Sequence, residues 1–184
     1  MAISDRDRLR EILRRYSVRR GGEFRLASGK ISDVYCDARV TTCRAEAMPL
    51  IGRLFLDLFA EREWRPEAVG GLTMGADPIV IAVARESLDR GPGINAFLVR
   101  KEPKGHGRRR QIEGLASDDP LDVVILDDVC TTGDSTIKAI EVAREAGHRV
   151  LGAACLVDRQ EGAREAIEAG LGCPFGSIFT LGEL

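Results

Sequence analysis

Residues 123–136 read VVILDDVCTTGDST. The apolar first part predicts a buried strand over residues 121–126, and the pattern after the loop predicts a helix over residues 135–146. Two adjacent acids, Asp127 and Asp128, directly follow the predicted strand. Two carboxylates sealed inside a protein are costly, so we expect both to face a ligand or solvent.

The loop after the two acids has the composition of a phosphate-binding site. It combines a flexible Gly133 and the free backbone N–H groups of a helix start with four hydroxyl side chains, Thr131, Thr132, Ser135 and Thr136. A helix dipole strengthens such an anion site. Carboxylates beside a phosphate cradle fit a phosphorylated sugar, because they accept hydrogen bonds from vicinal hydroxyls. The alternative is an ordinary strand, turn and helix with an Asx cap.

Strands and helices alternate along the rest of the chain. The patterns predict a first helix that starts after Ser4 and stops at Gly21-Gly22, and a strand, loop and strand over residues 24–37. Further helices are expected over residues 44–61, 75–89 and 162–169, further strands over 68–72, 96–100, 149–157 and 177–181, and an aperiodic segment over 101–114. This order predicts an α/β fold with a mainly parallel sheet, whose ligand site lies beyond the carboxyl ends of the strands.

Composition argues against several classes of protein. Of 184 residues, 44% are hydrophobic and 30% charged, and the longest apolar run, residues 150–157, is far shorter than the roughly 20 residues of a membrane span. Five cysteines without CxxC spacing, and no signal-peptide core after Met1, favour a reducing cytoplasm. A net charge of −2 argues against nucleic acid as a partner.

Positive charge is concentrated between Arg100 and Arg110. This stretch carries six cations against one glutamate, and it includes Lys101 and Lys104, two of only four lysines in the chain. A positive loop on an acidic body suggests a small, highly anionic ligand. Where lysine persists among so many arginines, a compact ammonium is favoured over a guanidinium.

Residues 124–135 resemble the phosphoribosyl pyrophosphate (PRPP) motif of the type I phosphoribosyltransferases. Residues 24–32, followed by Tyr35 and Asp37, resemble the N-terminal signature of the orotate phosphoribosyltransferase family. Residues 100–107 resemble its mobile catalytic loop, and residues 158–161 its base-site segment. The order and spacing agree from about residue 5 to residue 184.

The resemblance implies the type I phosphoribosyltransferase fold in a single domain over residues 1–184. An N-terminal helix and hood would cover about 1–40, the PRPP-binding core about 41–184, and the mobile catalytic loop about 101–114. The implied reaction transfers ribose 5-phosphate from PRPP to orotate, giving orotidine 5′-monophosphate and pyrophosphate for UMP synthesis, with Mg²⁺ as cofactor. The implied assembly is a homodimer in which the mobile loop of one subunit reaches the neighbour's site.

The resemblance also assigns roles to residues of this chain. Those implied to bind PRPP are Arg100, Lys101, Lys104, His106, Asp127, Asp128, Thr131, Thr132, Gly133, Asp134, Ser135, Thr73, Met74 and Gly75. Those implied to bind orotate are Ser28, Gly29, Lys30, Tyr35, Thr131 and Arg159. Lys101, Lys104, His106 and Asp128 are the implied catalytic residues, and Asp127 and Asp128 would hold Mg²⁺ directly or through water.

Chemistry supports part of this assignment and leaves part of it open. A fixed guanidinium such as that of Arg159 suits the orotate carboxylate, because bidentate pairing orients the ring. His106 has three open roles: neutral donor, imidazolium or general acid. Many relatives carry lysine where this chain has Ala27 and Met74, which makes Lys30 and the charged loop more important. Two alternatives remain at this point, a phosphoribosyltransferase that takes a purine and a non-catalytic nucleotide-binding regulator.

Overall fold

The computed structural model describes residues 3–25, 31–102 and 111–184. Its helices and strands follow one another as α1 (Asp5–Tyr16), β1 (Val18–Arg25), β2 (Ile31–Cys36), α2 (Arg39–Thr42), α3 (Met48–Glu61), β3 (Ala68–Leu72), α4 (Asp77–Ser87), β4 (Asn95–Val99), β5 (Ile112–Glu113), β6 (Asp122–Cys130), α5 (Asp134–Glu145), β7 (Arg149–Asp158), α6 (Ala163–Leu171), β8 (Phe175–Thr180) and the 3₁₀ turn η1 (Leu181–Glu183).

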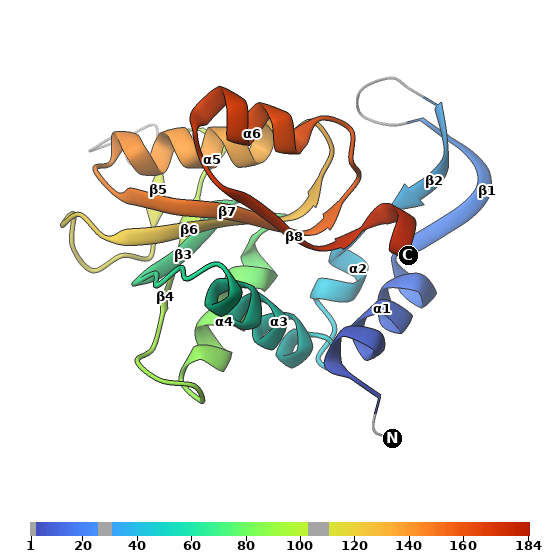
Figure 1. Ribbon diagram of the computed structural model, residues 1–184, viewed down its shortest axis with the longest axis horizontal. Coiled ribbons are helices and arrows are strands. Elements are labelled where there is room, and N and C mark those ends of the chain that lie inside the picture. The colour runs from blue at the N-terminus through green and yellow to red at the C-terminus, as the bar shows by residue number, and fades with distance from the viewer. Residues whose placement is uncertain (1–2, 26–30, 103–110) are drawn as a thin grey trace.

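A six-stranded sheet in the order β5-β4-β3-β6-β7-β8 forms the centre of the molecule. Every neighbouring pair is parallel except β4 and β5. In Figure 1, α5 and α6 lie over one face of the sheet and α3 and α4 lie under the other. The prediction of a mainly parallel sheet flanked by helices is therefore confirmed.

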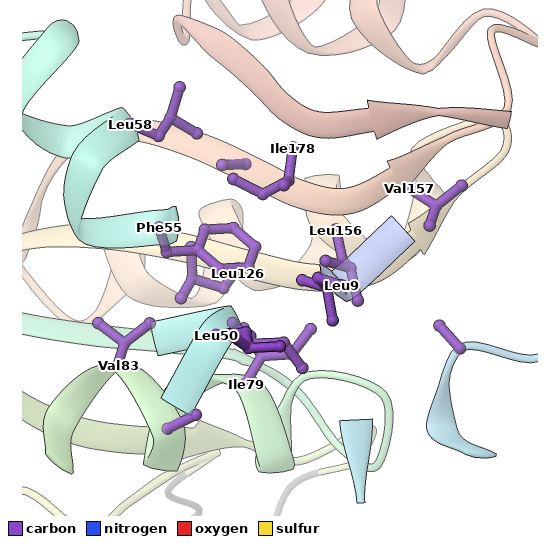
Figure 2. Packing of buried hydrophobic residues seen from close by; sticks show 14 of the residues in the cluster. Leu9, Leu50, Phe55, Leu58, Ile79, Val83, Leu126, Leu156, Val157 and Ile178 are labelled. Atoms are coloured by element: carbon purple, nitrogen blue, oxygen red, sulfur yellow. The ribbon is translucent and has the colours of Figure 1, made fainter. Parts of the chain in front are cut away.

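The hydrophobic core lies in two parts, one on each face of the sheet. On one face, buried side chains of α1, α3 and α4 pack against β6, β7 and β8. Figure 2 shows this packing, with Phe55 and Leu58 of α3 near Leu126 and Ile178 of the sheet. On the other face, α5 and α6 cover the opposite side chains of the same strands. Because these strands are buried on both faces, their sequences are continuous apolar runs.

The N-terminal region differs from the sequence prediction. We expected the first helix to run to Gly21-Gly22, but it ends at Tyr16, and Val18 already pairs with Cys36 in an antiparallel ribbon of β1 and β2. The two glycines lie inside β1, where the strand register shifts between Arg20 and Phe24. Gly21 has φ 78°, a conformation that glycine adopts without steric cost, so the pair forms a bulge and stops no helix.

The bounds of other helices and strands also differ from those predicted from the sequence. The helix expected from residue 44 begins at Met48, with Pro49 in its first turn, and α2 was not predicted. The strand expected to stop at residue 126 continues to Cys130, because β7 runs beside it as far as Asp158. The segment over 101–114, expected to be aperiodic, contains the short strand β5.

Two class predictions can be compared with the structure. No helix within residues 3–25, 31–102 and 111–184 is long and apolar enough to cross a membrane. The five cysteines all lie in these ranges and form no disulfide.

Candidate active site

Asp127 and Asp128 lie near the carboxyl end of β6 and face different surroundings. Asp127 is only 6% exposed, which corrects the expectation that both acids face a ligand or solvent. Its Oδ2 accepts a hydrogen bond from the Thr136 hydroxyl at 2.9 Å, and its Oδ1 accepts one from the Asp128 backbone N–H at 2.9 Å. These two bonds satisfy the carboxylate internally, which makes its burial possible.

Burial perturbs both carboxyl groups. Loss of solvent, and after it the negative charge of Asp128, raises the pKa of Asp127 to about 7, against the hydrogen bonds that favour its ionised form. Burial also raises the pKa of Asp128, opposed first by the hydrogen bond from the Val129 backbone N–H. Perturbed acids gather at functional sites, where a bound cation or a hydroxyl donor compensates their charge.

The loop between β6 and α5 has the geometry of an anion cradle. Gly133 precedes α5 with φ 89°, a left-handed conformation that favours glycine. Among the described residues no side chain caps α5, so the N–H groups of its first turn are available to a ligand. The side chains of Thr132, Asp134 and Ser135 are exposed and that of Thr131 is half-buried.

Thr136 departs from its expected place in the cradle. Its side chain is buried and turned toward Asp127. The sequence contained the signal for this orientation. Thr136, Ala139, Ile140 and Ala143 follow the i, i+3, i+4, i+7 spacing of the buried face of α5.

The loop from Thr73 to Gly75, between β3 and α4, packs against Asp128. A Cβ atom placed on Gly75 would lie 2.6 Å from Asp128 Oδ1, so the two segments are in direct contact. The Thr73 backbone N–H donates to the carbonyl of Val99 at 2.9 Å, and the Thr73–Met74 peptide bond is cis. The Met74 side chain is 68% exposed. The structure thus brings this loop and the acid pair together.

Arg159 follows β7 and lies beside the cradle. Its backbone N–H donates to the Cys130 carbonyl at 2.9 Å, which joins the ends of β7 and β6. Its side chain is only 6% exposed, and Nε donates to Glu161 Oε1 at 2.8 Å. The structure therefore places Arg159 at the predicted position and adds an ion pair with Glu161 that the sequence reading did not assign.

The end of β2 also belongs to this region. The charges of Asp128 and Arg159 both act on Cys36, the last residue of β2, whose pKa is raised to about 11 mainly by burial. Tyr35 stacks on Phe24 of β1 with 5.7 Å between ring centroids, so one face of its ring already has an aromatic neighbour.

Arg39 is a site residue that the sequence reading missed. Its Nε donates to Asp37 Oδ1 at 2.9 Å and its Nη2 to Asp37 Oδ2 at 3.2 Å. Its positive charge acts on Asp128 and opposes the upward shift of the pKa of that acid. The Asp37-x-Arg39 spacing was visible in the sequence, but only the folded chain brings this guanidinium, at the start of α2, toward the acids.

The structure describes the charged segment after β4 only at its start, residues 100–102, and at its end, from residue 111. Arg100 and Lys101 are exposed, and the Arg100 backbone N–H donates to the Gln111 carbonyl at 2.8 Å. Lys138 of α5 donates to the Lys101 carbonyl, which ties the start of the segment to the helix that begins at the cradle. The predicted site residues Lys104 and His106, and likewise Ser28, Gly29 and Lys30, lie outside the described residues.

Comparison with known proteins identifies relatives of the chain. The phosphoribosyl transferase domain family matches residues 45–170. The orotate phosphoribosyltransferase of Aquifex aeolicus is 45% identical over 186 residues and covers all of both chains. Crystal structures of the Mycobacterium tuberculosis orotate phosphoribosyltransferase are similar over 98% of both chains, with 41% identity and a TM-score of 0.85 for the Fe(III) dicitrate complex, and 37% and 0.81 for the PRPP complex. This full-length similarity, with the motifs and geometry above, shows that the chain belongs to the orotate phosphoribosyltransferase family.

Proposed function

We propose that this chain transfers the ribose 5-phosphate group of PRPP to N1 of orotate. The products are orotidine 5′-monophosphate and pyrophosphate, and the reaction serves UMP synthesis. The observation that carries the proposal is similarity over the whole chain to orotate phosphoribosyltransferases, one of them crystallised with PRPP. We further propose that residues 1–184 form one domain, with a hood over about 1–40, a core over about 41–184 and a mobile loop over about 101–114.

The ribose 5-phosphate end of PRPP binds at the cradle. The backbone N–H groups at Gly133 to Ser135 and the hydroxyls of Thr131, Thr132 and Ser135 hold the 5-phosphate, with support from the helix dipole. Asp128 accepts hydrogen bonds from the ribose hydroxyls. The uncapped start of α5 and the position of Asp128 near the end of β6, one short loop before that helix, support this arrangement.

The pyrophosphate end of PRPP leaves during the reaction. The bond between ribose C1 and the pyrophosphate oxygen breaks, and the ribose develops oxocarbenium character. N1 of orotate forms the new bond to C1 and gives up its proton to solvent. Negative charge grows on the leaving group, so preorganised donors stabilise the transition state most. The Met74 and Gly75 N–H groups of the 73–75 loop, which packs on Asp128, are such donors, whereas the Thr73 N–H already donates to the Val99 carbonyl. The other donors are the side chains of Arg100, Lys101, Lys104 and His106.

Orotate binds on the side of the site formed by Arg159 and the hood. Arg159 pairs with the orotate carboxylate, while Glu161 fixes the orientation of its guanidinium. Tyr35, Thr131 and residues 28–30 complete the base site. Because an ion pair with Glu161 holds the buried guanidinium of Arg159 in one orientation, the guanidinium needs little reorganisation when the substrate arrives.

The donor set fits Mg²⁺ as cofactor. No group of three or more His, Cys, Asp or Glu residues converges in the described part of the chain. Mg²⁺ is typically bound by one or two carboxylates together with substrate phosphates and water, so Asp127 and Asp128, directly or through water, suffice with PRPP present. When bound, the ion neutralises charge on the pyrophosphate group.

The active assembly is a homodimer, in the cytoplasm, with the loop over 101–114 of one subunit completing the site of the other. When equal amounts of a Lys104→Ala chain and an Arg159→Ala chain are mixed at random, about half of the dimers are mixed and each mixed dimer has one intact site of two. Activity is then expected to reach about a quarter of the wild-type value. Activity is compared with that of each variant alone. No recovery in a purified mixed dimer would contradict a shared site.

Orotate absorbance with PRPP and Mg²⁺ tests the function. We expect orotate to be consumed, consumption to stop in EDTA, and adenine, hypoxanthine and uracil to be inert in parallel reactions. Turnover of a purine instead of orotate would overturn the assignment of the base. PRPP binding without turnover of any base would favour a regulator.

A further inference from the structure

A buried chain of hydrogen bonds links the first turn of α5 to the acid pair. The Thr136 hydroxyl donates its single proton to Asp127 Oδ2 at 2.9 Å. Cys130 Sγ lies 3.2 Å from the same hydroxyl oxygen. Because the hydroxyl proton is already used, the Cys130 thiol acts as the donor in that contact. Thr136 and Cys130 are each about 1% exposed, so no solvent replaces these bonds.

The hydrogen bonds continue from Asp127 to Asp128. Asp127 Oδ1 accepts the backbone N–H of Asp128 at 2.9 Å, and Asp128 Oδ1 accepts the N–H of Val129 at 2.8 Å. The plane of the Asp127 carboxylate therefore sets the peptide that carries Asp128. Asp128 in turn lies against Gly75 of the 73–75 loop.

We propose that Thr136 is a positioning residue for PRPP binding: its buried hydroxyl fixes the plane of the Asp127 carboxylate and, through it, the backbone that presents the Asp128 carboxylate to the ribose. Thr136 does not touch the substrate. It acts through Asp127 on the backbone of Asp128. The inference rests on the proposed function only in taking PRPP as the ligand of the acid pair.

A matched set of threonine variants tests this role. Thr136→Val replaces the hydroxyl by a methyl group of similar size, Thr136→Ala removes it without a replacement, and Thr136→Ser retains it. Thr42 provides the control, because it is fully buried and, within the described residues, its hydroxyl has no hydrogen-bond partner. Thr42→Val therefore makes the same chemical change in the core without breaking a hydrogen bond.

The first readout is PRPP binding in the presence of Mg²⁺, measured by titration calorimetry without orotate. We expect Thr136→Val and Thr136→Ala to weaken PRPP binding about tenfold, the effect of losing one hydrogen bond to a charged group. Thr136→Ser and Thr42→Val are expected to bind PRPP within about twofold of wild type. A twofold change corresponds to less than half of the binding free energy that a tenfold change represents. Thermal melting of each variant confirms that the folded state is compared.

The second readout is the separation of kinetic constants with orotate as acceptor. Thr136→Val is expected to raise KM for PRPP and leave KM for orotate unchanged, and Thr136→Ser to restore KM for PRPP. Unchanged PRPP affinity in folded Thr136→Val, or an equal loss in Thr136→Ser, would overturn the positioning role while leaving the proposed function intact. Wild-type protein that binds no PRPP would overturn both.

Discussion

Gly75→Ala tests whether the 73–75 loop and Asp128 form one PRPP site. The new Cβ would lie 2.6 Å from Asp128 Oδ1 and 2.9 Å from its Cγ. An ordinary contact between such atoms is about 3.4 Å or longer, so the loop and the acid must separate by nearly 1 Å. Asp128 cannot retreat without loss, because its Oδ1 accepts the Val129 N–H at 2.8 Å.

The expected effect of Gly75→Ala follows from that displacement. Inserting a methyl group into a packed contact costs about 1–3 kcal/mol, and a 1 Å displacement of a site group can cost about 100-fold in rate. We therefore expect kcat/KM for PRPP to fall about 100-fold and the melting temperature to fall by a few degrees.

Steady-state assays at saturating orotate with varied PRPP measure the kinetic effect of Gly75→Ala. Gly170→Ala is the matched control, because Gly170 lies in α6 and a Cβ there would meet nothing within 4 Å. That control should keep wild-type kinetics and gain about 0.5–1 kcal/mol of stability. If Gly75→Ala keeps kcat/KM for PRPP within twofold, the 73–75 loop and the acid pair do not form one PRPP site.

Three further predictions concern packing, the base site and pH. In Gly152→Ala the new Cβ would lie 2.2 Å from Trp64 Cζ2, so calorimetry should show a loss of about 1–3 kcal/mol in the free energy of unfolding. KM for PRPP should not change, and an unchanged melting temperature would contradict this close packing. Glu161→Gln removes the ion pair that orients Arg159 and should raise KM for orotate about tenfold but not KM for PRPP; equal rises in both would count against Arg159 as the base contact. In EDTA and without ligand, the raised pKa of Asp127, about 7 against 3.8, contributes stability that is fully present below about pH 4 and is lost as the pH rises through 7. The melting temperature of wild type should therefore fall relative to Asp127→Asn between pH 4 and 7, and parallel melting profiles would refute this.

The sequence predicts the framework of the fold because its signals are local. The continuous apolar runs of β3 and β6 and the helical spacing of α5 need no tertiary information. The prediction that Gly21-Gly22 ends the first helix was wrong, because glycine is common both at helix ends and in β-bulges. Here Val18 already pairs with Cys36, so the two glycines lie in a strand and form a bulge.

The candidate site was only partly predictable from sequence. Asp128 and the cradle follow from the order of strand, acids, loop and helix. The internal role of Asp127 depends on how α5 packs on β6, which turns Thr136 inward. The place of Arg39 near the acids depends on how the start of α2 packs in the folded chain. The pairing of Glu161 with Arg159 depends on how the chain turns after β7. Sequence spacing alone predicted neither.

Product stoichiometry distinguishes transfer of ribose 5-phosphate to orotate from the other reactions of PRPP. Purified protein is incubated with PRPP, orotate and Mg²⁺, and orotidine 5′-monophosphate and pyrophosphate are quantified separately. We expect equal amounts of both products with orotate, and neither product when adenine or hypoxanthine replaces it. Pyrophosphate release without orotidine 5′-monophosphate, or a purine nucleotide formed in its place, would show that orotate is not the acceptor.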